Sequence, residues 1–233
     1  MRGSARGPAA RQDQAGRQDR VPARARVFAL PRGGVPVAAG VAVALRAPLD
    51  VLMVRKIGHP TTPELGLGAI AEDGHGGALA PYFDQELLRQ AGLVASDLAG
   101  VVARERAELA RRVAAYRRPA AAGPAGGGPA GGGPAGGGGA ADLSGQLAIV
   151  VDDGLATGVT ARAALRAVRA RGPVASMLAV PVASAAAVAA MKSETDEVVT
   201  LVTPRRFLSV GEWYVDFGQL TDADVLTLLA AIP

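Results

Sequence analysis

Short apolar runs alternate along the chain with segments whose apolar residues recur at helical spacing. The runs predict five strands, at residues 27–30, 50–54, 147–151, 174–182 and 197–202. The intervening pattern predicts helices at residues 36–46, from Ser96 to Arg118, and at 159–171, 184–192 and 222–230. Ser96 is the expected N-cap of its helix, and Thr221 with Asp224 forms the expected capping pair of the last one. This alternation predicts an α/β fold of Rossmann-like type, a parallel sheet flanked by helices.

Two segments lack the pattern. Residues 1–24 are rich in Arg, Gln, Gly and Ala and are predicted to be a disordered tail. Residues 119–141 repeat Pro-Ala-Gly-Gly-Gly with a period of five, which is typical of a flexible linker and excludes collagen. Such a linker could separate two domains. We favour a surface insertion in a single domain over 25–233, because neither half alone supplies a complete sheet or site.

The amino-acid composition argues against several classes of protein. The 233 residues include no cysteine, which excludes disulfides, thiol catalysis and zinc ribbons. No apolar run is long enough to span a membrane and residues 1–20 lack the apolar centre of a signal peptide, so we expect a cytoplasmic protein without a membrane partner. The net charge is +4, but many arginines lie in the tail and on helix faces, where solvation explains them; nucleic acid is not the expected partner.

The clearest chemical signal follows the strand at 147–151. Asp152 and Asp153 stand where that strand ends, which is the ligand-binding edge of an open α/β sheet. The turn after them supplies flexible backbone and hydroxyl groups, from Gly154, Thr157, Gly158 and Thr160. The next helix points its first N–H groups into this turn, which suits a phosphate. The pattern indicates a ligand with a phosphate at one end and hydroxyls or a metal at the other; the alternative is an acid pair that only caps a helix.

Basic residues follow the other two strands of the first half. Arg32, Gly33 and Gly34 come directly after the strand at 27–30, where the guanidinium and closely approaching backbone suit a pyrophosphate. Arg55 and Lys56 end the strand at 50–54, where two cations could offset the same charge. The alternatives are an ordinary turn with a solvated arginine and a solvated basic strand end.

Four segments together resemble the type I phosphoribosyltransferases, and most closely a bacterial group of predicted phosphoribosyltransferases whose substrate is undefined. They are Val27-Phe-Ala-Leu-Pro-Arg-Gly-Gly-Val-Pro36, Leu49-Asp-Val-Leu-Met-Val-Arg-Lys-Ile-Gly58, Pro63-Glu-Leu-Gly-Leu-Gly-Ala-Ile70 and Leu147-Ala-Ile-Val-Val-Asp-Asp-Gly-Leu-Ala-Thr-Gly-Val-Thr160. The resemblance covers roughly residues 27–118 and 142–230. It implies a sheet domain with a small hood, and a glycosyltransferase that transfers phosphoribose from phosphoribosyl pyrophosphate to a nitrogenous acceptor and releases pyrophosphate.

The resemblance also implies residue roles. Asp152 and Asp153 would face the ribose hydroxyls and, through water, a Mg²⁺ ion, and with Lys56 they form the expected catalytic set. The expected substrate-binding residues are Arg32, Gly33, Gly34, Arg55, Gly154, Ala156, Thr157, Gly158, Val159 and Thr160, the last five at the 5-phosphate. Residues 57–68 correspond to the mobile loop that closes over the reaction centre. Residues 1–26 depart from the family, since they lack its amphipathic first helix.

The acceptor is not readable from the sequence. Four aromatic residues crowd into eleven positions and could stack on a base or pack the last helix on the sheet, of which we favour packing: Phe207, Trp213, Tyr214 and Phe217. An alternative function is a non-catalytic regulator of this fold that senses phosphoribosyl pyrophosphate or nucleotides and binds nucleic acid or a protein. A nucleotide hydrolase is disfavoured, because the chain has neither a Walker loop nor a Gly-x-Ser-x-Gly elbow. The sequence is compatible with a homodimer.

Overall fold

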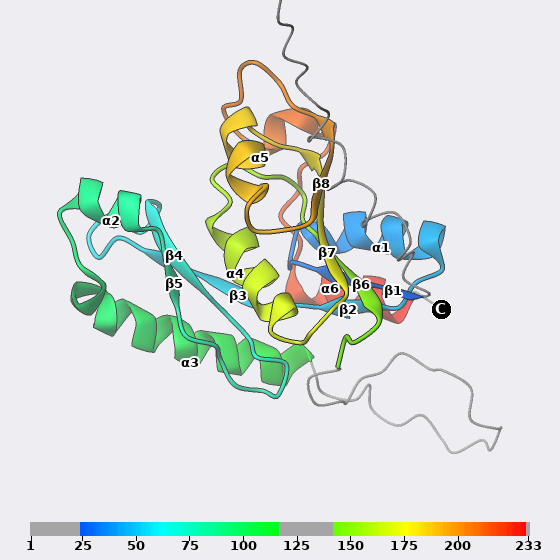
Figure 1. Ribbon diagram of the computed structural model, residues 1–233, viewed down its shortest axis with the longest axis horizontal. Helices are drawn as coiled ribbons and strands as arrows, with labels where there is room; N and C mark the ends of the chain where they lie inside the picture. The colour runs from blue at the N-terminus through cyan, green and yellow to red at the C-terminus, as the bar shows by residue number, and fades with distance from the viewer. Residues whose placement is uncertain (1–23, 117–141, 232–233) are drawn as a thin grey trace, which may run out of the picture.

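The computed structural model describes residues 24–116 and 142–231, so the predictions for the tail before Arg24 and for the insertion at 119–141 lie outside the described residues. Five parallel strands form the main sheet in the order β2-β1-β6-β7-β8 (Figure 1). Their bounds are β1 Arg24–Ala29, β2 Leu49–Val51, β6 Gln146–Val151, β7 Ala175–Val182 and β8 Glu197–Val202. The predicted parallel α/β sheet is thus present, although β1 begins inside the segment predicted as tail.

Helices cover both faces of this sheet. On one face lie α1, Gly34–Leu45, and α6, Asp222–Ala230; on the other lie α4, Val159–Arg169, and α5, Ala185–Met191 (Figure 1). The predicted capping pair of the last helix is confirmed, because Thr221 Oγ1 accepts from the Asp224 N–H while the Asp224 carboxylate accepts from the Thr221 N–H. None of the helices in the described ranges is long and apolar enough to cross a membrane.

A second, antiparallel sheet follows where the sequence predicted one strand at 50–54. β2 ends at Val51, and the chain enters β3, Val54–Gly58, which pairs with β4, Gly66–Ala71, and through it with β5, Tyr82–Phe83. The single-strand prediction is wrong because the chain changes partners at Met53. The Leu52 N–H still donates to Ala29 in the main sheet, but the Met53 N–H donates to the buried carboxylate of Glu72, at 2.9 Å.

Three helical segments complete this part of the chain: α2, Gln85–Ala91, the 3₁₀ turn η1, Ala95–Leu98, and α3, Ala99–Tyr116. The prediction of Ser96 as a helix N-cap is wrong. The Asp97 carboxylate accepts from the Val94 N–H at 2.8 Å and closes a 3₁₀ turn, so the α-helix begins only at Ala99. The predicted end at Arg118 lies outside the described residues. α4 packs between the two sheets, and α3 covers the far side of the second one (Figure 1).

Candidate active site

The site begins where β1 and β6 end side by side. Ala29 pairs with Val151 in parallel register, and the Leu30 N–H donates to the Val151 carbonyl at 2.9 Å. Because carboxyl ends of neighbouring parallel strands meet at one edge, the turn at 32–34 and the acid pair at 152–153 are brought together. The structure therefore joins two predicted groups of site residues that lie more than a hundred positions apart in the sequence.

Two glycines make this approach possible. A Cβ on Gly33 would collide with the carboxylate of Asp153, and a Cβ on Gly34 would stand 2.8 Å from the Val151 carbonyl oxygen and 2.9 Å from the Cα of Asp152. The Gly34 N–H already donates to the Leu30 carbonyl, at 3.1 Å. Gly34 therefore allows close packing and is not a free donor for an anion, whereas Arg32, preceded by a cis peptide bond from Pro31, stays half-buried at the rim.

The surroundings of the acid pair disfavour the charged form of both carboxyl groups. Burial raises the pKa of Asp152 well above its ordinary value, and the neighbouring Asp153 charge raises it further. Burial also raises the pKa of Asp153, partly offset by hydrogen bonds from Asp152 and from backbone N–H groups. The Asp153 backbone N–H donates to Asp152 Oδ1 at 2.9 Å and orients the Asp152 carboxylate. Two crowded carboxylates of this kind favour a ligand that brings positive charge or hydroxyl donors.

The turn after the acids is held on the ends of β7 and α5. The Leu155 N–H donates to the Val182 carbonyl, and the Ser184 hydroxyl donates to the Ala156 carbonyl, both at 2.9 Å. Gly158 has φ 80°, a left-handed backbone that favours glycine, and no side chain caps α4 at this position. The first N–H groups of α4 thus point into a turn whose Ala156 and Thr157 are exposed, which is the geometry of an anion site.

A C-terminal segment, residues 203–221, lies over the acid pair. The Tyr214 hydroxyl donates to the Asp153 carbonyl at 2.5 Å, and burial followed by the Asp153 and Asp152 charges raises the pKa of Tyr214 to about 12. The side chain of Val210 abuts Gly154, where an added Cβ would come within 2.5 Å of it. The Phe217 ring stands 5.2 Å from that of Tyr214, between centroids. This segment therefore packs against the backbone of the acid-pair loop, at Asp153 and Gly154.

The match to known proteins agrees with this geometry. The sequence model of the phosphoribosyl transferase domain covers residues 18–217. The chain belongs to the phosphoribosyl transferase domain family. Two Mycobacterium tuberculosis proteins, Rv0571c and MT0597, whose names assign them provisionally as phosphoribosyl transferases, are each 40% identical to it over 203 residues, or 87% of this chain. The chain spans only 41% of the length of these relatives.

A solved structure supports the same fold. The crystal structure of TT1426 from Thermus thermophilus is 38% identical to this phosphoribosyl transferase domain and has a TM-score of 0.65, with coverage of 89% of this chain and 88% of that one. The parallel five-stranded sheet flanked by helices is thus the type I phosphoribosyltransferase fold that the sequence predicted. The acid pair and the turn at 32–34 both lie inside the matched range.

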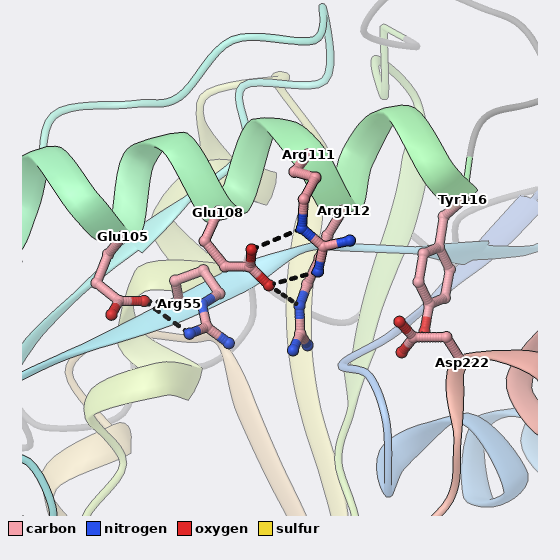
Figure 2. A network of polar contacts seen from close by, with 7 residues as sticks. All are labelled: Arg55, Glu105, Glu108, Arg111, Arg112, Tyr116 and Asp222. Carbon is pink, nitrogen blue, oxygen red and sulfur yellow. Dashed lines mark hydrogen bonds and ion pairs between the residues drawn. The ribbon is translucent and has the colours of Figure 1, made fainter.

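Two residues of the predicted substrate site lie in a different sheet from the one expected. Arg55 and Lys56 do not end a strand of the main sheet, since both belong to β3 of the second sheet. The Arg55 guanidinium pairs with Glu105 of α3 at 2.8 Å, as Figure 2 shows. Lys56 Nζ donates to the Glu64 carbonyl across the hairpin, at 3.0 Å. In this structure Arg55 holds the second sheet to α3, and Lys56 is the more exposed of the two cations.

The predicted mobile loop at 57–68 is shorter than expected. Ile57 and Gly58 belong to β3, and residues 66–68 belong to β4, so residues 59–65 alone connect the strands. The His59 N–H donates to the Leu65 carbonyl at 2.8 Å and closes the hairpin. The reason is the Gly66–Ala71 run, whose glycines let β5 approach closely: a Cβ on Gly68 would collide with the Tyr82 carbonyl.

One contact that the sequence does not predict joins α3 to α6. The Tyr116 hydroxyl donates to the carboxylate of Asp222 at 2.8 Å and ties the end of α3 to the start of α6 (Figure 2). Burial and this hydrogen bond raise the pKa of Tyr116 to about 12, while the nearby Arg112 and Arg32 charges act in the opposite direction. Arg32 is therefore within electrostatic reach of this pair. No local sequence pattern predicts the contact, because it joins positions 106 residues apart.

The aromatic cluster behaves differently from the favoured interpretation. Trp213 and Phe217 are 43% and 48% exposed, so they do not pack the last helix onto the sheet. Tyr214 instead contacts the acid-pair loop, as described above. The packing prediction is wrong for these residues because their segment folds over the site edge and not into the core.

Proposed function

We propose that this chain is a phosphoribosyltransferase that binds phosphoribosyl pyrophosphate with Mg²⁺ and transfers phosphoribose to a nitrogenous acceptor. The observation that carries the proposal is the contact between Gly33 and Asp153, which sets a basic turn against an acid pair at one sheet edge. Phosphoribosyl pyrophosphate presents a matching pattern, with pyrophosphate at one end of a dihydroxylated ribose and a phosphate at the other.

Each end of such a substrate has a partner in the described residues. The uncapped start of α4 offers backbone N–H groups from 156–160 to the 5-phosphate, together with the hydroxyls of Thr157 and Thr160. Asp152 and Asp153 would accept hydrogen bonds from the ribose hydroxyls. Arg32 would hold the pyrophosphate through its guanidinium fork. Reaction at the anomeric carbon then depends on positioning and on stabilising the charge of the leaving group.

The donor set fits Mg²⁺. The described ranges contain no cluster of three or more His, Cys, Asp or Glu side chains suited to a metal. Mg²⁺ is commonly bound by one or two carboxylates, substrate oxygens and retained waters, and the crowded pair Asp152 and Asp153 supplies that set. When bound, the ion would neutralise charge on the departing pyrophosphate.

Lys56 is proposed to add positive charge from the hairpin. The residue is exposed, and its Nζ donates to the Glu64 carbonyl within the same hairpin. Release of this contact would free the long, flexible side chain to turn its ammonium group toward the pyrophosphate. Arg55, engaged with Glu105, is proposed to fix the base of the hairpin and not to contact substrate.

The acceptor would enter on the side of residues 203–221, where Trp213 and Phe217 are exposed beside the acid pair. The test is pyrophosphate release from phosphoribosyl pyrophosphate and Mg²⁺ across a panel of nucleobases and simple amines. We expect release with at least one nitrogenous acceptor and loss of release in Asp152→Asn. Tight binding with no release for any acceptor would contradict the transferase and favour the non-catalytic regulator.

A further inference from the structure

The outer edge of the main sheet carries an unprotected apolar strand. β8 ends the strand order, and among the described residues it pairs only with β7. Edge strands are usually blunted by charge, proline or brevity. β8 has six residues, and the stretch from Val198 to Thr203 contains neither a charge nor a proline. Val199 and Leu201 are 38% and 81% exposed.

The hydrogen-bonding direction of this strand can be read from its ends. The Asp196 N–H donates to Ser176, and the Val202 carbonyl accepts from Ala183, so even-numbered residues face β7. Because backbone groups alternate sides along a strand, Glu197, Val199 and Leu201 direct their N–H and C=O groups away from the sheet. The same three side chains share the exposed face. Donors, acceptors and apolar side chains are thus all available on one edge.

We propose that β8 pairs antiparallel with β8 of a second copy of this chain, which joins two five-stranded sheets across a two-fold axis. In the register centred on Thr200, Val199 of each copy stands opposite Leu201 of the other, as a pair joined by two backbone hydrogen bonds. Because the contact is isologous, it buries the exposed side chains of Val199 and Leu201 in each of the two copies.

The charged residues at the two ends of β8 favour a second copy of the chain as its partner. Glu197 begins the strand, and Arg205 and Arg206 follow its end, all of them exposed. An antiparallel two-fold arrangement places the acidic start of one strand beside the basic exit of the other, with Glu197 diagonal to Arg205. A parallel arrangement would instead place like charges together. The strand is therefore self-complementary in both its apolar and its charged positions.

Sedimentation velocity of the full chain over a concentration series tests this interface. We expect a monomer–dimer equilibrium whose dissociation constant rises at least about tenfold in Leu201→Lys and in Val199→Pro. The proline removes an outward-facing N–H and leaves the bonds to β7 in place. Val43→Lys, at a 59% exposed position of α1, is the control and should leave the equilibrium unchanged. Circular dichroism and a melting curve establish that each variant is folded.

Charge reversal tests the orientation. Glu197→Arg should weaken the dimer, and adding Arg205→Glu to the same chain should restore it, because each new arginine then meets a new glutamate. Concentration-dependent protection of the Val199 and Leu201 amides from hydrogen exchange is expected as well. A monomer at the highest soluble concentration, or a dimer that Leu201→Lys and Val199→Pro leave intact, would overturn the proposal.

Discussion

The hydroxyl of Tyr214 donates a hydrogen bond to the backbone carbonyl of Asp153, at 2.5 Å. This contact joins the segment at 203–221 to the acid pair and fixes the strand end from which both carboxylates project. The turn at 32–34 also lies against the acid pair, because Gly33 approaches the Asp153 carboxylate closely. The acid pair is therefore positioned by two segments that are remote from it in sequence, which gives each of them a testable role.

Tyr214→Phe removes that hydrogen bond and leaves the Asp153 carbonyl unpaired on this side. We expect a loss of roughly 1 kcal/mol in the free energy of unfolding and weaker binding of phosphoribosyl pyrophosphate. Tyr82→Phe is the matched control. The hydroxyl of Tyr82, in β5, accepts a hydrogen bond from Arg162 at 2.6 Å. Loss of this bond should lower the free energy of unfolding without changing ligand affinity. Denaturant titration and calorimetry separate the two effects. Equal affinities in both variants would argue against a positioning role for Tyr214.

Gly33→Ala places a methyl group against the Asp153 carboxylate. Since the carboxylate must move, we predict a marked loss of ligand binding together with lower stability. Gly40→Ala is the control within α1, where an added Cβ meets nothing within 4 Å. That change should stabilise the protein by about 0.5–1 kcal/mol, because alanine loses less conformational entropy in a helix. Normal binding by Gly33→Ala would show that the close approach does not serve the site.

The raised pKa values of Asp152 and Asp153 predict how stability depends on pH. A carboxyl whose pKa in the folded state exceeds its unfolded value, ordinarily 3.8, binds protons more tightly when folded. Its contribution is therefore fully present at low pH and is lost as the pH rises from the unfolded toward the folded pKa. Part of the melting temperature of the ligand-free protein should therefore be lost as the pH rises. The double variant Asp152→Asn with Asp153→Asn should lack this loss. A double variant with the pH profile of the parent would contradict the assigned shifts.

Arg55 and Glu105 should behave as a structural pair. Their partly buried contact, at 2.8 Å, predicts a coupling free energy of about 1 kcal/mol in a double-mutant cycle of Arg55→Ala and Glu105→Ala. Lys56→Ala should instead leave stability nearly unchanged and weaken pyrophosphate binding more than ribose 5-phosphate binding. Additive stability losses at Arg55 and Glu105, or a Lys56 variant that binds both ligands normally, would contradict this division of roles.

The sequence predicted the main sheet well, because buried parallel strands are short apolar runs. It also placed the turn at 32–34 and the acid pair at the same sheet edge, where neighbouring parallel strands end. It did not predict the second sheet. The apolar run from Val51 to Val54 is continuous, and the break inside it depends on the Glu72 carboxylate nineteen residues away from Met53. Helix α2 was not predicted, although the sequence carries signals at both of its ends. The Asp84 carboxylate accepts from two N–H groups at its start, and Gly92 ends it with φ 67°.

Direct titration of phosphoribosyl pyrophosphate in the presence of Mg²⁺ tests the central claim, that the acid pair and the turn at 32–34 form one substrate site. We predict saturable binding to the unaltered chain, and loss of most of that affinity in Asp152→Asn with Asp153→Asn and also in Arg32→Ala, with both variants folded. Binding that is unchanged in the two variants would place the ligand elsewhere and contradict the assignment of this site.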